Sequence, residues 1–273
     1  MEPILCAHLL RKVDEKLLDL LESLRPDEWE LPTVAPGWKV RDVAAHLLDT
    51  PLRKLSLVRD GCVVEPAVIR SPQDLAAMVN RLNREGVLVF RRLSPPVLIS
   101  LMRAACGESA RFHESLDPFA PAAFGVSWAG EEQSRNWFDT ARELTERWHH
   151  QQQIRHATGR PGILTPELYH PVLDCFLRGL PHAYRDTTAA PGTVVRVEIA
   201  GDCGGAWQIR REAANWEMAP PEGRWDARVV VPQEIAWRIF TKGIARDEAE
   251  RQVSLEGDRA LAGQLLELTA IVA

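Results

Sequence analysis

The stretch TERWHHQQQIRH, at residues 145–156, brings a carboxylate and three imidazoles close together in the sequence. The segment has a helical pattern, and side chains four residues apart are neighbours on one face of a helix. Glu146 and His150 are therefore neighbours, whereas His149 points about 100° away around the helix axis. Carboxylates and imidazoles are ligands of zinc and similar divalent ions, so Glu146 and His150 form a candidate chelate.

A solvent-exposed helix face would show the same pair, because a glutamate and a histidine four residues apart often occur by chance. The apolar stripe of this helix consists of Trp137, Ala141, Leu144 and Trp148. A catalytic metal site uses three protein ligands and leaves a further position open. His46, in the apolar segment VAAHLLD, is the third candidate, since helix bundles build sites from side chains on facing helices. A hydrogen-bonded core histidine is the alternative for His46.

Helical patterns account for the chain up to about residue 185. Apolar residues at helical spacing predict helices over residues 4–24, 36–58, 71–93, 94–107, 134–158 and 165–179. Pro51 should kink or divide the second of these helices, Ser71 should cap the third, and Gly107 should end the fourth. Residues 108–133 have the pattern of a long irregular loop, which in a compact domain is more often functional than idle.

After residue 190 the pattern changes to short alternating segments rich in Val, Ile and Trp, which are typical of strands. Strands are predicted over residues 193–201, 206–212, 215–221 and 226–232. Helices over 232–243 and 258–273 close the chain, with VSLEGD between them. The expected fold class is therefore α+β, with a helical metal-binding domain over residues 1–185 and a small α+β domain over residues 190–273.

The composition is that of a soluble globular protein, with 45% hydrophobic and 26% charged residues. The formal net charge of -5 has no long block of one sign behind it, so nucleic acid is not expected as a partner. No apolar run approaches the ~20 residues that cross a bilayer, so no membrane association is expected. The five cysteines contain no C-x-x-C pair and suit a reducing compartment, and MEPILCAHLLRK has no basic leader. We expect a cytoplasmic protein that is a monomer or a homodimer.

Two longer motifs carry a resemblance to a known family. LPTVAPGWKVRDVAAHLLDT, followed about a hundred residues later by TERWHHQQQIRHATGRPG, resembles the mycothiol-dependent maleylpyruvate isomerase family, within the DinB-like metal-binding four-helix bundles. The segments AWRIFTKG and VSLEGDRALAGQLLELTAIVA resemble the smaller α/β domain of that family, which is similar to sterol carrier proteins. The resemblance implies an N-terminal DinB-like four-helix bundle followed by a small sterol-carrier-like domain.

The same resemblance implies a set of ligands. Carried over residue by residue, His46, Glu146 and His150 bind a divalent metal, usually zinc, with nickel as the alternative. Relatives often have threonine where this chain has Lys39, so a helix cap is missing, while Asp42 still favours the start of that helix. The metal ligands themselves match the family pattern.

The family's chemistry is the addition of a low-molecular-weight thiol, such as mycothiol, to a cis double bond conjugated to carbonyls. The resemblance thus implies a thiol-dependent isomerase or thiol transferase whose partners are the thiol and a small unsaturated acid. Such an acid needs a cation, and Arg238 is the candidate, although an arginine on an exposed helix face is the alternative. Two other functions stay open: a carrier of hydrophobic ligands, and a metal-dependent hydrolase that uses metal-bound water. Trp38 and Trp148 are expected to be core anchors.

Overall fold

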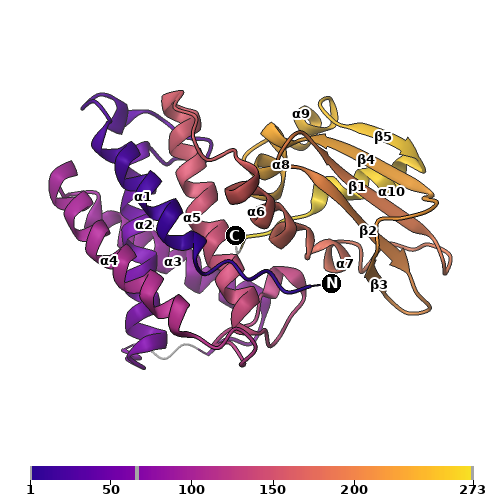
Figure 1. Cartoon of the computed structure of the whole chain (residues 1–273), viewed down its shortest axis with the longest axis horizontal. Helices are drawn as coiled ribbons and strands as arrows, with labels where there is room; N and C mark the ends of the chain where they lie inside the picture. Colours follow the sequence, from indigo (N-terminus) through magenta and orange to yellow (C-terminus); the bar gives the residue numbers. More distant parts are fainter. Residues whose placement is uncertain (1, 65–67, 272–273) are drawn as a thin grey trace. The chain divides into compact units, whose positions relative to one another are not determined.

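The computed structural model describes residues 2–64 and 68–271, which fall into two compact units. The helical unit comprises the described residues of 5–125 and 133–163, and the sheet unit comprises 2–4, 126–132 and 164–271 (Figure 1). These units differ from the expected ranges 1–185 and 190–273 because helices α6 (Pro166–Leu177) and α7 (Leu180–Ala183) belong with the sheet. Whether the two units are independent domains stays a prediction.

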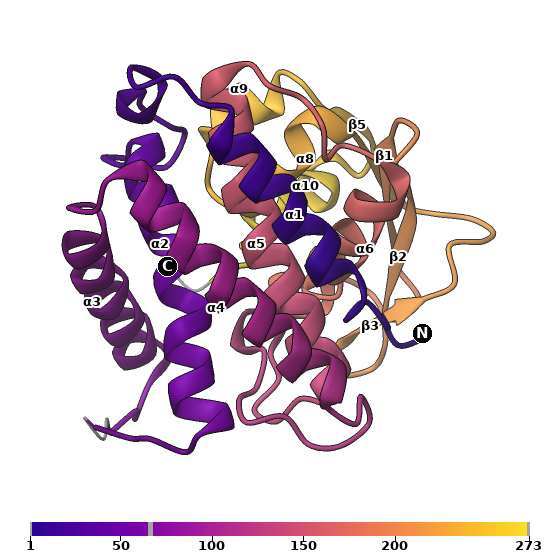
Figure 2. The ribbon, with the colours of Figure 1, turned by 60° about the vertical axis from the view of Figure 1, so that its left-hand side comes forward.

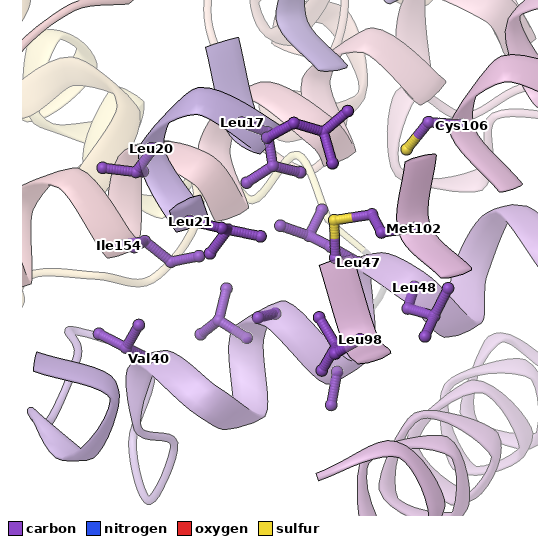
Figure 3. Close-up of a cluster of buried hydrophobic side chains, with 14 of the residues drawn as sticks. Leu17, Leu20, Leu21, Val40, Leu47, Leu48, Leu98, Met102, Cys106 and Ile154 are labelled. Atoms are coloured by element: carbon purple, nitrogen blue, oxygen red, sulfur yellow. The ribbon is translucent and has the colours of Figure 1, made fainter. Parts of the chain in front are cut away.

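Four helices of the helical unit share one apolar core, as the resemblance to four-helix bundles predicts. They are α1 (Leu9–Glu22), α2 (Val40–Lys54), α4 (Pro95–Ser115) and α5 (Asn136–Thr158). Figure 3 shows side chains from all four in one cluster, among them Leu17, Leu47, Met102 and Ile154. The further helix α3 (Pro72–Phe90) packs against α2, as Figure 2 shows. Burial of apolar surface among α1, α2, α4 and α5 therefore holds this unit together.

Several helix ends differ from the sequence-based expectations. The first helix begins at Leu9, because Ile4 and Cys6 are buried on either side of the exposed Leu5, an alternation typical of extended chain. The expected end of α4 at Gly107 is wrong, because a buried face continues through Ser109, Ala110 and His113 to Ser115. Pro51 lies inside α2, which runs into a π-helical turn, η2 (Leu55–Arg59). The expected cap of α3 is confirmed, since the Ser71 hydroxyl accepts a hydrogen bond from the Asp74 N–H at 3.1 Å.

The sheet unit contains five strands in the order β3-β2-β1-β4-β5. Their bounds are β1 Val194–Ala200, β2 Gly205–Arg211, β3 Trp216–Ala219, β4 Ala227–Pro232 and β5 Ser254–Gly257. Strands β1 and β4 pair in parallel and the other neighbours pair antiparallel. The strand β5 was not expected, because a four-residue edge strand with a Glu and a Gly carries little strand pattern. The α+β class is confirmed.

The two parallel strands, β1 and β4, each present one apolar face and one polar face. Buried side chains such as Val195, Val197 and Val229 alternate with Arg196 and Arg228, which bind polar neighbours on adjacent strands. Helices α8 (Gln233–Phe240) and α10 (Arg259–Gly263) pack against β1 and β4. Short helices complete the chain: η1 Glu28–Glu30, η3 Ser127–Ala129, α9 Arg246–Glu250 and η4 Gln264–Glu267. Among the described residues, none of the helices combines the length and apolar character needed to cross a bilayer.

Candidate metal centre

The start of α2 is set by a local capping arrangement. Lys39 occupies the N-cap position with an extended backbone, and its own N–H donates to the Asp42 carboxylate at 3.0 Å. Asp42 also lies 3.2 Å from Arg91. A capping box normally has two reciprocal hydrogen bonds, one accepted by the side chain at the N-cap and one accepted by the side chain three residues later. Because a lysine side chain cannot accept, only the second bond, to Asp42, is present here. The helix then places His46 in its second turn, facing α5, which packs against α2.

Three side chains from α2 and α5 converge. His46, Glu146 and His150 each offer one ligand atom, and these atoms lie within 4.8 Å of one another. The His150 Nε2 lies 3.5 Å from the Glu146 Oε2. The rings of His46 and His150 meet edge to face, with centroids 4.5 Å apart. His46 is buried, whereas Glu146 and His150 are partly exposed. Solvent therefore reaches the three residues from the side of α5 and not from the side of α2.

The protonation states of His46 and Glu146 suit a metal. Burial, together with the neighbouring His150, lowers the pKa of His46 well below 6.5, so its imidazole is neutral at pH 7. Burial of Glu146 raises its pKa, but the hydrogen bond with His150 and the nearby positive charge of Arg142 outweigh this and hold the pKa at about 2. Two neutral imidazoles and one carboxylate are the donor set of many catalytic zinc sites.

Two further observations show that the donor set fits a divalent ion. The buried Nδ1 of His46 has no hydrogen-bond partner among the described residues. A buried polar atom without a partner lowers the stability of the fold, and a bound ion would supply a partner. The Nδ1 of His150 lies 2.9 Å from the Gln153 Oε1. Because an amide oxygen only accepts, the His150 Nδ1–H donates to Gln153, and Nε2, the nitrogen that faces Glu146, is the one left to bind an ion.

Sequence reasoning missed two neighbours of these ligands. Trp38 packs against the apolar core, as expected of a core anchor, but its half-buried ring also lies against both histidines, with centroids 5.1 Å from His46 and 6.3 Å from His150. Gln153 had no signal beyond its spacing of three residues from His150. By contrast Trp148 is a core anchor, as expected: its side chain is fully buried and its indole N–H donates to the Ile163 carbonyl at 3.0 Å.

The histidine next to the ligands is held by the backbone. The His149 Nδ1 lies 2.7 Å from the Thr145 carbonyl oxygen, and burial lowers the pKa of this histidine to about 3. Its ring centroid is 4.0 Å from that of His150. His149 is therefore a neutral, buried support beside the ligand.

A second pair of contacts joins α2 to α5 two helical turns after His46. The Lys54 ammonium lies 2.9 Å from the Asp139 Oδ2 and 3.2 Å from the Glu143 Oε2, and all three side chains are buried. Lys54 and His46 are eight residues apart and so lie on the same face of α2. This buried ion cluster fixes the register of α2 against α5 and with it the position of His46.

Arg238, the cation expected from the sequence, lies on α8 in the sheet unit. Its Nε donates to the Gly243 carbonyl at 3.1 Å, and its Nη2 lies 3.8 Å from Glu248. A role for Arg238 in binding a substrate stays a prediction.

Comparisons with known proteins show which family the chain belongs to. The family model described as the mycothiol maleylpyruvate isomerase N-terminal domain matches residues 10–155, a range that contains all three candidate ligands. Two uncharacterized Mycobacterium tuberculosis proteins, from strains CDC 1551 / Oshkosh and H37Rv, are each 28% identical over 199 residues, covering 72% of this chain and 74% of theirs.

Two solved structures share the fold. Crystal structures of the mycothiol-dependent maleylpyruvate isomerase and of one of its mutants align with TM-scores of 0.51 and 0.52, at 13% and 12% identity. Each alignment covers 92% of this chain and 91% of the solved chain. At such low identity these two likenesses concern the fold alone. The family model matches more than half of the sequence, and the chain therefore belongs to the mycothiol maleylpyruvate isomerase N-terminal domain family.

Proposed function

We propose that this protein is a divalent-metal-binding enzyme that uses a low-molecular-weight thiol, such as mycothiol, to isomerise or conjugate a small unsaturated acid. The observation that carries the proposal is the convergence of one ligand atom from each of His46, Glu146 and His150 within 4.8 Å. These residues would hold the metal, with zinc as the expected ion and nickel as the alternative. Family membership supports the thiol, because the family's name and its solved relatives are tied to mycothiol.

The residues of the chain have separate tasks in this proposal. A divalent ion with an open position lowers the pKa of a bound thiol, so that thiolate is available near neutral pH. Glu146 supplies the one anionic ligand, and its low pKa keeps it ionised across the physiological range. Gln153 holds His150 in the tautomer that presents Nε2. The Trp38 ring lies against both histidines and would limit their movement on that side.

Isomerisation and conjugation differ in what happens to the thiol. Reversible addition of sulfur to a conjugated cis double bond gives that bond single-bond character, so that it rotates, and elimination returns the thiol with the trans product. Conjugation stops at the protonated adduct and consumes one thiol for each acid. Because both outcomes begin with the same addition, the ratio of thiol consumed to acid converted separates an isomerase from a transferase.

The proposal is tested with the full chain, purified and loaded with zinc, together with a thiol and maleylpyruvate as a cis-unsaturated acid. We expect conversion that requires the thiol and that is lost in His150→Ala but retained in His156→Ala, a matched change at the exposed end of the same helix. Hydrolysis of ester or amide substrates without thiol would instead support the metal-dependent hydrolase. Absence of any metal-dependent turnover, with retention of a fluorescent fatty acid, would favour the carrier.

A further inference from the structure

In the middle of α5 the partly exposed side chains form a single line of three residues. From Phe138 to Arg155 every residue of the helix is buried except Arg142, Glu146 and His150. Their side chains retain 24%, 25% and 12% of their exposure, respectively. Residues spaced by four lie one above the other on a helix, so Arg142 is the next side chain along the line that leads to the two candidate ligands. A small molecule that reaches Glu146 and His150 along α5 therefore meets a guanidinium.

The guanidinium of Arg142 is held from one side. Its Nε and Nη2 donate to the same oxygen, Asp139 Oδ1, at 3.2 and 2.8 Å. The other oxygen of Asp139 and the carboxylate of Glu143 bind the Lys54 ammonium. Asp139 thus orients Arg142 through the Nε edge and leaves the Nη1 edge for a further acceptor. A planar guanidinium presents two parallel N–H groups on each edge, which match the two oxygens of a carboxylate.

The charges around this line favour an anion when a metal is bound. Three cations and three carboxylates form the buried ion network: Lys54, Arg142 and Arg147 with Asp14, Asp139 and Glu143. This network is neutral as a whole. The candidate metal site adds a divalent ion to two neutral imidazoles and one carboxylate, which leaves one positive charge in excess at the accessible end of the line.

We propose that Arg142 binds a carboxylate of the small molecule that reaches Glu146 and His150, and that Arg142 thereby selects anionic ligands at this site. The inference rests on the proposed function, because it assumes a ligand at the metal. It assigns a specificity-determining residue within the helical unit itself, on the same helix as two of the metal ligands. Arg142 would place the carboxylate one helical turn from Glu146, about 6 Å along the axis, which is the span of a small dicarboxylic acid.

The test is calorimetric and does not depend on turnover. Maleate, a small cis dicarboxylate, is titrated into the zinc-loaded full chain of wild type, Arg142→Gln and Arg103→Gln, the last being an exposed arginine of α4 paired with Glu22. We expect Arg142→Gln to raise the Kd of maleate about tenfold or more, because a charge-assisted bidentate contact is lost. Zinc content should stay at the wild-type level, and Arg103→Gln should bind maleate as wild type does.

Each other outcome decides a different claim. Unchanged maleate affinity in Arg142→Gln, or no maleate binding to zinc-loaded wild type, overturns the role of Arg142 and leaves the metal site standing. Failure of wild type to bind zinc contradicts the proposed function instead. If Arg142→Gln loses zinc, Arg142→Lys takes its place, since its ammonium still reaches Asp139. Its Kd for maleate should then rise at least about threefold, because one ammonium cannot hold Asp139 and a carboxylate in parallel, and an unchanged Kd overturns the inference.

Discussion

His113 makes the helical unit sensitive to acid. This α4 side chain is 2% exposed, and its Nδ1 lies 3.0 Å from the Thr140 hydroxyl oxygen. Its Nε2 has no hydrogen-bond partner among the described residues. Burial, with the charge of Lys54 next in importance, lowers the pKa of His113 from 6.5 to about 3. The folded protein therefore keeps this histidine neutral at a pH where the unfolded chain protonates it.

The sign and size of the effect follow from that shift. Between pH 6.5 and 3 the unfolded state binds a proton that the folded state does not, so stability falls as the pH falls through this window. One pKa unit corresponds to ~1.4 kcal/mol, and between pH 7 and pH 4 the contribution amounts to ~3 kcal/mol. The variant His113→Gln keeps an amide that can bond to Thr140 but does not titrate. Its free energy of unfolding should therefore fall ~3 kcal/mol less than that of wild type over this range.

Chemical denaturation followed by circular dichroism at pH 7, 6, 5 and 4 measures this difference. Carboxylates such as Asp139, whose pKa is lowered to about 2, contribute equally to both proteins and cancel in the comparison. His8→Gln, a change at an exposed histidine, should follow the wild-type curve. Parallel curves for wild type and His113→Gln would refute the assignment of this acid sensitivity to His113.

Variants of Gln153 and Lys54 test the two supports of the candidate metal centre. Gln153→Ala should weaken metal binding by about 10- to 100-fold, whereas Gln153→Glu, which still accepts from His150, should stay close to wild type. Equal metal Kd values for the two variants would show that the bond to His150 does not contribute to metal binding. Lys54→Met should destabilise the protein by ~3 kcal/mol, because it removes the ammonium that the buried carboxylates of Asp139 and Glu143 share and leaves the network with an excess negative charge. Lys39→Met is the control, because it breaks an ion pair of the same 2.9 Å separation that is exposed to solvent. The free energy of unfolding, measured by thermal or chemical denaturation, should fall by less than ~1 kcal/mol in this variant. Equal losses in the two variants would contradict the idea that burial makes the Lys54 pairs stronger.

The candidate ligands could be predicted from the sequence to different degrees. Glu146 and His150 required only helical spacing, because both lie on one continuous helix. His46 required the pairing of α2 with α5, which no local pattern contains, so the sequence offered it as one of two alternatives until the family motif supported it as a ligand. The placement of Trp38 against both histidines depends on the path of the loop before α2, whose turn closes through a bond from the Thr33 N–H to the Trp38 carbonyl.

The differences in the fold have similar causes. Gly107 has the local signature of a helix end, but the buried face formed by Ser109 and His113 carries α4 past it, an example of tertiary contacts that override propensity. Helix α6 has the same apolar pattern as the bundle helices. It lies in the sheet unit, where its Tyr169 hydroxyl donates to the Gln233 carbonyl at 2.8 Å and accepts from the Trp237 N–H at 3.1 Å. The spacing of apolar residues along a helix does not show against which other element the helix packs.

The most direct test of the metal centre is elemental analysis of the full chain, purified without an affinity tag or a chelator, beside His46→Ala and His150→Ala. The account predicts about one divalent ion per wild-type chain and its loss in both variants, with circular dichroism showing that the helices remain folded. His156→Ala, an exposed position near the end of α5, should retain the ion. A wild-type protein that stays metal-free after reconstitution, or variants that hold as much metal as wild type, would contradict it.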